Sequence, residues 1–454
     1  MHRLGLLLLL LGSAWSSSAA AKRLIVFGDS ISDNGNGTNA MVQAYFSQLL
    51  GQNVTAPYPP GPFFFDGRWS NGPVWPEYVA DKTGYELIDM AVGSSTTNKT
   101  TSFHGVGDFY PSSLLSNKRG ARNVTLPTFN EAVTSFLSKN TVTTDDVVVI
   151  ESGINDILGF FEANIITTLT YAEDASSGNT TIPMYIVQEV ADAIRAGLEQ
   201  LYAAGARRFA VWDLCAGEAV PLANTLNSLM NTVNAILQGI RALDARQNAL
   251  RDFTKTFVDA ANVALEGVVK TFSAAHADAV IVNFPFATIQ RGFVTNYGQL
   301  GFVNAVSGCA SDLAITQYST GNLYSLADPT FTAEGAKATL SLSPFLIQKL
   351  NKLGSDLYGT NGQQNIPRTT TEFIERLKTI IASYLDGSNT LGHLTGYILT
   401  SQPLTKGGLS PYDIVPTCFL QSADHLFHDE VHPTTKQHAL LANSFLKYAE
   451  KLFQ

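Results

Sequence analysis

Short apolar runs alternate along the chain with longer stretches of helical periodicity. The apolar runs fall near residues 24–28, 86–91, 146–151, 207–213 and 279–284. Their length and the turn residues that bound them predict buried strands. Apolar positions at helical spacing predict helices over 187–203, within 226–272 and over 435–453. Strands that alternate with helices predict an α/β fold, a three-layer arrangement in which helices cover both faces of a parallel sheet.

Residues with catalytic potential follow the first three predicted strands. Ser30 comes after the first strand, Gly93 and Ser94 come after the second, and Asn155 comes after the third. Ligands of parallel sheets bind beyond the carboxyl ends of the strands, so we expect these residues to gather at one edge. A serine at a strand-to-helix turn is well placed to act as a nucleophile. It also needs a base for its proton and donors for an oxyanion.

Composition and the first residues indicate a secreted protein. The chain has 454 residues and a formal net charge of −9, which argues against nucleic acid or an anionic membrane as a partner. Residues 1–21 have a polar start, a short apolar core and a small-residue end. This pattern predicts a signal peptide and leaves 22–454 as the mature chain of an extracellular protein. An uncleaved anchor is less favoured, because the apolar core is too short to span a bilayer.

Three blocks, in this order, resemble the GDSL, or SGNH, hydrolases. Phe27-Gly28-Asp29-Ser30 is similar to the first block of that family, and Gly153-Ile154-Asn155-Asp156 is similar to the third. Asp429 with His432-Pro433-Thr434 is similar to the last block. The blocks bracket about the whole mature chain, so the resemblance implies a hydrolase domain over residues 22–454. The resemblance implies the flavodoxin-like fold of the family, a serine nucleophile and the hydrolysis of ester bonds. Ser94 stands where the second block usually has its oxyanion-hole glycine.

The resemblance also implies roles for individual residues. Ser30 would be the nucleophile, His432 the base, and Asp429 the group that orients the imidazole. The implied oxyanion donors are the N–H of Ser30, the N–H of Gly93 or Ser94, and the side chain of Asn155. No metal and no organic cofactor are needed for this chemistry. Ser32 occupies the last place of a Gly-x-Ser-x-Gly elbow, which argues against an ordinary α/β-hydrolase.

Other interpretations of these residues exist. Ser30 could be an ordinary turn serine, and Asn155 could cap a helix. Asp424 is an alternative to Asp429 as the acid. A metal site is the main rival for the histidines, since metal ligands of the right type cluster near the end of the chain, namely His425, His428, His432 and His438 with Asp424 and Asp429. We expect His438 to face outward on the last helix, which weakens that rival.

The cysteines and the glycosylation sequons suit a secreted chain. Plant and fungal GDSL enzymes carry a cysteine after a Tyr-Gly-Phe-x-Asn run and another before the last block. The resemblance therefore implies a disulfide between Cys309 and Cys418, with Cys215 as a buried free thiol. Five asparagines begin Asn-x-Ser/Thr sequons, and four of them are expected to carry glycans, namely Asn53, Asn98, Asn123 and Asn179. Asn36 is excluded because it lies too close to Ser30.

Two further segments have no assigned catalytic role. Residues 57–78 are dense in aromatic residues and proline, and residues 67–72 have the sequence GRWSNG, which resembles a segment of fungal and plant members. This aromatic segment either walls an acyl or sugar pocket or forms a satellite core under a long loop. Residues 310–415 are expected to form a helical insertion, either a lid or a small cap, because loops of this length are usually functional or disordered.

The sequence thus predicts a serine esterase that acts through an acyl-enzyme. Acetyl esters of carbohydrates, or other short-chain acyl esters, are the expected substrates. A lipase or lysophospholipase acting on lipid esters is the first alternative, because the aromatic segment also suits an acyl groove and the insertion suits a lid. A binding protein on an inactive hydrolase scaffold is the second. We expect an ester of a small molecule, polysaccharide or lipid as partner, no nucleic acid and no stable membrane insertion. The oligomeric state stays open.

Overall fold

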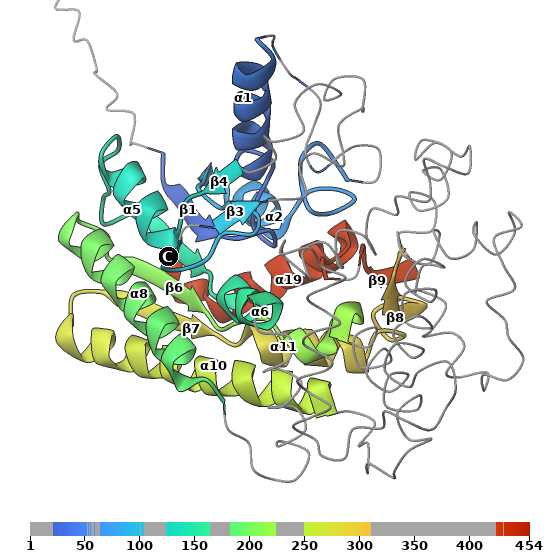
Figure 1. Cartoon of the computed structure of the whole chain (residues 1–454). Helices are drawn as coiled ribbons and strands as arrows, with labels where there is room; N and C mark the ends of the chain where they lie inside the picture. Colours follow the sequence, from blue (N-terminus) through green and yellow to red (C-terminus); the bar gives the residue numbers. More distant parts are fainter. Residues whose placement is uncertain are drawn as a thin grey trace, which may run out of the picture.

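A computed structural model shows the chain as a sheet flanked by helices (Figure 1). The structure describes residues 21–51, 53, 55, 59, 64–99, 101–103, 124–163, 182–223, 249–309, 424–429 and 431–454. The predicted signal peptide, but for its last residue, and the whole predicted insertion at 310–415 lie outside the described residues. The predicted helix within 226–272 is described from residue 249 on.

The main sheet has five parallel strands in the order β2-β1-β5-β6-β7. They are β1 (Arg23–Gly28), β2 (Glu86–Asp89), β5 (Val147–Glu151), β6 (Arg208–Trp212) and β7 (Val280–Phe284). Each corresponds to one apolar run of the sequence. β1 and β5 are central strands with nearly every residue buried, as expected of a parallel sheet that is covered on both faces. The predicted three-layer α/β fold is confirmed.

Eight described helices surround this sheet or extend from it. They are α1 (Thr38–Leu50), α2 (Trp75–Thr83), α5 (Phe129–Leu137), α6 (Ile154–Ala163), α8 (Met184–Ala203), α10 (Ala249–Ala275), α11 (Phe286–Thr295) and α19 (Thr435–Tyr448). Single 3₁₀ turns lie at Gly217–Ala219 and Glu450–Leu452. No helix in the described ranges combines the length and the apolar character needed to cross a bilayer.

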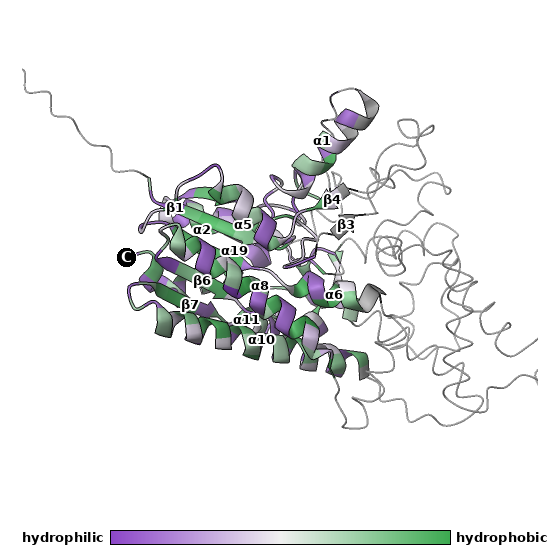
Figure 2. Ribbon diagram, turned by 60° about the vertical axis from the view of Figure 1, so that its left-hand side comes forward, coloured by the Kyte–Doolittle hydropathy of each residue, from purple (hydrophilic) through white to green (hydrophobic). Residues whose placement is uncertain are grey.

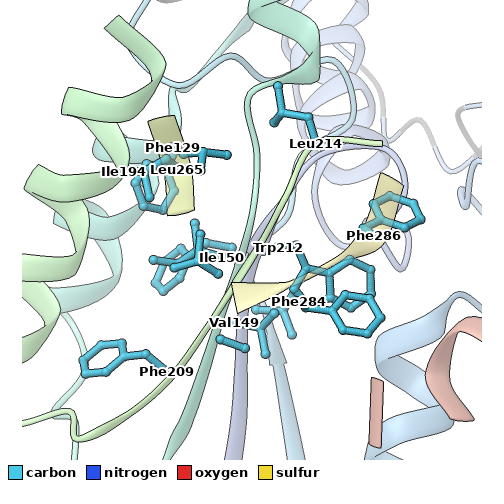
Figure 3. Close-up of a cluster of buried hydrophobic side chains, with 14 of the residues drawn as sticks. Phe129, Val149, Ile150, Ile194, Phe209, Trp212, Leu214, Leu265, Phe284 and Phe286 are labelled. Atoms are coloured by element: carbon cyan, nitrogen blue, oxygen red, sulfur yellow. The ribbon is translucent and has the colours of Figure 1, made fainter. Parts of the chain in front are cut away.

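Aromatic contacts show which helices cover each face of the sheet. On one face, Trp212 of β6 packs against Trp75 of α2 and Phe445 of α19, with ring centroids 4.2 and 5.3 Å apart. On the other face, Phe27 of β1 contacts α5, and Phe209 of β6 lies 5.3 Å from Phe272 of α10. Figure 3 shows Trp212, Phe284 and Phe286 on one side of the strands and Phe209 with Ile194 on the other. In Figure 2 the sheet is largely coloured as hydrophobic, between amphipathic helices.

Two small sheets were not predicted. β3 (Thr101–Phe103) pairs antiparallel with β4 (Val124–Leu126), and β8 (Asn304–Gly308) pairs parallel with β9 (His425–Phe427). The second pair matters for function, because β9 leads directly into the candidate aspartate and histidine. The pairing places β9 beside β8, a strand that comes more than a hundred residues earlier in the chain.

Candidate active site

Ser30 lies in a tight turn that directly follows β1. The N–H groups of Ser32 and Asp33 both donate to the carbonyl of Asp29, at 3.1 and 2.9 Å. Gly28 allows this turn, because a Cβ at that position would lie 2.7 Å from the Cβ of Ser32. The strand therefore ends with the Ser30 hydroxyl at the carboxyl edge of the sheet, where the sequence predicted it.

A chain of hydrogen bonds joins Ser30 to the last block. Nε2 of His432 lies 2.8 Å from Oγ of Ser30, and Nδ1 of His432 lies 2.7 Å from Oδ2 of Asp429. The other oxygen of Asp429 accepts the N–H groups of Val431 and His432, each at 2.7 Å. Burial alone would raise the pKa of the Asp429 carboxyl, but His432 and these hydrogen bonds lower it below its usual range. The acid is thus ionised and aimed at the imidazole.

Asp33 connects the nucleophile turn to the second block. Its buried carboxylate accepts the N–H groups of Gly35, Gly37, Thr38 and Gly93, at 3.0, 3.1, 2.9 and 2.9 Å. The sequence marks Asp33 as the start of a turn, Asp33-Asn34-Gly35-Asn36-Gly37, but does not predict its bond to the second block. The signal for the bonds within the turn is its place ahead of Asn34 and Gly35, because aspartate side chains commonly bond the backbone of such turns.

The bond from Gly93 to Asp33 bears on the oxyanion donors. The Gly93 N–H is directed at a carboxylate, so it does not suit an oxyanion. Of the two alternatives left by the sequence, the geometry favours Ser94. Ser94 has a φ of +66°, a left-handed conformation that costs a non-glycine residue free energy and often marks a functional site.

Asn155 is held by the second block rather than capping its own helix. Its Nδ2 donates to the carbonyl of Ser95 at 2.9 Å, which leaves the second N–H of the amide for another acceptor. The next residue, Asp156, accepts both the N–H and the hydroxyl of Thr97, at 2.8 and 2.9 Å. Burial raises the pKa of Asp156 to about 6. The turn of Ser30, the loop of Ser94 and the first turn of α6, which carries Asn155, are therefore tied together by these bonds.

The histidine cluster differs from the expectation in one respect. His438 was predicted to face outward on the last helix, but its side chain is fully buried. Burial lowers its pKa to about 3, so the ring is neutral. Within the described ranges, no group of three His, Cys, Asp or Glu side chains is arranged to hold a metal ion.

Only some of the other predicted residues can be placed. Cys215 is a buried free thiol, and Cys309 is buried after β8. Asn53 and Asn98 are exposed. Cys418, Asn123 and Asn179 lie outside the described residues.

Comparison with known proteins shows which sequences this chain is similar to. The sequence profile of the family described as GDSL-like Lipase/Acylhydrolase matches residues 24–445. The chain is 29% identical over 158 residues to a phosphatidylcholine-sterol acyltransferase of Aeromonas hydrophila, covering 35% of this chain and 39% of that protein. It is 29% identical over 205 residues to a thermolabile hemolysin of Vibrio parahaemolyticus, covering 40% and 42%.

A plant relative is similar over a longer stretch. GDSL esterase/lipase 6 of Arabidopsis thaliana is 26% identical over 221 residues, covering 45% of this chain and 54% of that protein. The matched part of each of these relatives is thus between about two fifths and just over half of its length.

Proposed function

The chain belongs to the GDSL-like lipase/acylhydrolase family, and we propose that it is a secreted serine esterase that cleaves carboxylic esters. The observation that carries this proposal is the continuous hydrogen-bond chain from Asp429 through His432 to Ser30. This is the arrangement in which a base takes the proton of a nucleophile while a carboxylate fixes the tautomer of the base.

The reaction follows from the positions of these groups. Nε2 of His432 takes the proton of Ser30 as Oγ attacks the ester carbonyl. The carbonyl oxygen becomes an oxyanion, which accepts hydrogen bonds from the N–H groups of Ser30 and Ser94 and from the Asn155 amide. The imidazolium then gives its proton to the leaving alcohol as the bond between carbonyl carbon and alcohol oxygen breaks. Water, activated by His432, attacks the acyl-enzyme and releases the acid.

Short acyl groups, in particular acetyl esters of carbohydrates, are the substrates that we propose first. Lipid esters are the second candidate. The Aeromonas relative is named as an acyltransferase of phosphatidylcholine and sterol, and the Vibrio relative as a hemolysin. An acyl-enzyme that reacts with an alcohol instead of water transfers its acyl group to that alcohol. Hydrolysis and acyl transfer therefore use the same residues.

Hydrolysis of p-nitrophenyl esters from acetyl to palmitoyl tests both points. We expect Ser30→Ala to lower kcat by at least about 10³-fold, as the loss of a nucleophile does in other serine hydrolases. The far-UV circular dichroism spectrum should not change. Ser138→Ala, which removes an exposed hydroxyl at the end of α5, is the matched control. An active Ser30→Ala protein would refute the assignment, and preference for palmitoyl over acetyl esters would favour the lipid candidate.

A further inference from the structure

Trp69 lies between the catalytic histidine and the oxyanion loop. Its ring stacks on that of His432, with centroids 5.1 Å apart and an interplanar angle of 30°. The Nε1 edge of the indole faces Gly93 so closely that a Cβ there would lie 2.2 Å from Nε1. Phe64 contacts the indole edge-on at 5.8 Å. One buried side chain thus contacts segments from both ends of the chain.

The next two residues hold the backbone that follows His432. Oγ of Ser70 donates to the carbonyl of Pro433 at 2.9 Å, and Oδ1 of Asn71 accepts the N–H of Thr435 at 2.8 Å. Thr435 is the first residue of α19, so its N–H has no acceptor within the helix. Both side chains are buried.

This contact continues past Asn71. A Cβ at Gly72 would lie 2.8 Å from the side chain of Thr435, and the hydroxyl of Thr435 donates to the carbonyl of Pro73 at 2.8 Å. The same hydroxyl lies 2.6 Å from the phenol oxygen of Tyr78 in α2. Thr435 is therefore enclosed by the end of the GRWSNG sequence and by residues that follow it.

The segment is itself fixed on its other side. Arg68 makes a bidentate ion pair with Glu77 of α2, at 2.8 and 2.7 Å, and both side chains are mostly buried. The N–H of Phe65 donates to the carbonyl of Ser70 at 2.8 Å and closes the loop. A rigid support of this kind can hold a neighbouring side chain in one orientation.

From these contacts we propose that Trp69, Ser70 and Asn71 form a clamp that positions His432 for proton transfer; the proposal rests on the proposed function. Asp429 fixes the imidazole from the N-terminal side of His432, and the clamp fixes it from the ring face and from the C-terminal side. Rotation of the ring would break the bonds to both Ser30 and Asp429, and the stacked indole opposes that rotation. The clamp residues are positioning residues, because they act on the reaction through His432.

The clamp gives the aromatic segment a different role from the two that the sequence left open. A pocket wall would affect the binding of substrate. A satellite core would affect only the stability of the fold. A clamp acts on the rate of proton transfer, because a misplacement of about 1 Å can lower a rate by about 10²-fold. These three roles give different results in one set of variants.

The test compares Trp69→Leu and Trp69→Phe with the wild-type protein, using p-nitrophenyl acetate and diisopropyl fluorophosphate. We expect Trp69→Leu to lower kcat by about tenfold or more while KM changes less than about twofold. Inactivation by the fluorophosphate should slow in proportion, because it depends on the same Ser30–His432 pair. Trp69→Phe keeps an aromatic face and should retain activity within about threefold of wild type. Ser70→Ala and Asn71→Ala should lower kcat in the same way, and they remain informative if Trp69→Leu fails to fold.

Phe272→Leu is the matched control, because it removes a buried ring that packs against Phe209 on the other face of the sheet. It should lower thermal stability and leave kcat unchanged. A raised KM with unchanged kcat in Trp69→Leu would overturn the clamp in favour of a pocket wall. Unchanged kcat and KM, or a loss of kcat equal to that of Phe272→Leu, would overturn it in favour of a satellite core.

An active Ser30→Ala protein would refute the proposed function instead, and the rate of inactivation by the fluorophosphate reports on the clamp even when no ester is turned over.

Discussion

The backbone of Gly308, which carries no side chain, packs directly against the backbone of Asp429. A Cβ at Gly308 would lie 2.3 Å from both the carbonyl carbon and the carbonyl oxygen of Asp429. Because those atoms belong to the backbone, they cannot move aside as a flexible side chain would. The β8–β9 pair therefore sets the position of the acid that orients His432.

Gly308→Ala should accordingly impair both stability and activity. Overpacking of this kind costs about 1–3 kcal/mol of folding free energy, and displacement of Asp429 should lower kcat by about tenfold or more. Chemical denaturation and p-nitrophenyl acetate hydrolysis measure the two effects. Gly267→Ala is the control, since Gly267 is exposed on α10 with nothing within 4 Å of the added methyl group. Equal behaviour of the two variants would show that the close approach has no consequence.

Asp33→Asn should disconnect the nucleophile turn from Gly93. An amide has one acceptor oxygen where the carboxylate has two, so its NH₂ would face two backbone donors. Each buried donor left without an acceptor costs about 1–3 kcal/mol. We expect lower stability in urea and a lower kcat. Asn34→Ala, which removes one exposed hydrogen bond of the same turn, should have little effect on either quantity. Wild-type kcat in Asp33→Asn would contradict a role in holding the second block.

Ser94→Gly tests the strain at the second block. The positive φ of Ser94 costs a residue with a Cβ about 1–2 kcal/mol, and glycine adopts it freely. The variant should unfold at a higher urea concentration and retain kcat, because the backbone N–H is kept. Loss of stability would mean that contacts of the serine side chain outweigh the strain.

His438→Gln should make the protein less sensitive to acid. The folded-state pKa of His438 is lowered to about 3 from an unfolded value near 6.5, so the unfolded state binds more protons between these values. The stability contributed by the neutral ring is therefore present above about pH 6.5 and is lost as the pH falls toward about 3. Unfolding free energies from urea titrations should fall less steeply in His438→Gln than in wild type across this range.

The informative quantity in that experiment is the difference in unfolding free energy between wild type and His438→Gln at each pH. Asp29, whose pKa is raised by burial to about 7, acts in the opposite direction in part of the same range. Its folded state binds more protons than its unfolded state, so its contribution favours folding at low pH. If the unfolding free energies of wild type and His438→Gln fell in parallel as the pH is lowered, the prediction for His438 would be refuted.

A non-reducing peptide map tests the proposed bridge between Cys309 and Cys418. We expect a linked pair of peptides from these cysteines. Cys215 should be recovered unlinked. Burial raises the pKa of the Cys215 thiol well above its usual value, so a maleimide should label it only after denaturation. A linked peptide that contains Cys215 would overturn the pairing.

The sequence was sufficient for the parts of the fold with strong local signals. The run Val147-Val148-Val149-Ile150 is apolar without interruption, and it forms a central strand with every residue buried. The short strands β8 and β9 have no such signal. They owe their pairing to contacts between segments that are distant in sequence, with an irregular register between them.

The site, like the fold, has residues that the sequence identifies and residues that only contacts between distant segments reveal. Ser30, Asp429 and His432 could be named because their spacing resembles a family pattern, and the structure brings them together. The prediction for His438 was wrong, because histidine is intermediate in how often it is buried, and only the packing of α19 shows that this one is buried. The contact of Trp69 with His432 has no sequence signal, since it depends on how an aromatic loop meets the last block.

The hydrogen bond between Ser30 and His432 joins residues 402 positions apart. Ser30 is therefore synthesised well before His432 during translation. A nascent chain cannot hold the pair until the segment from Asp429 to Thr435 has left the ribosome and α19 has docked on α2. Such distant contacts also form late in folding, because the long loop between them must first be closed. The Ser30–His432 pair is thus absent from a partly synthesised chain, and it forms only when segments that are 402 positions apart have come together.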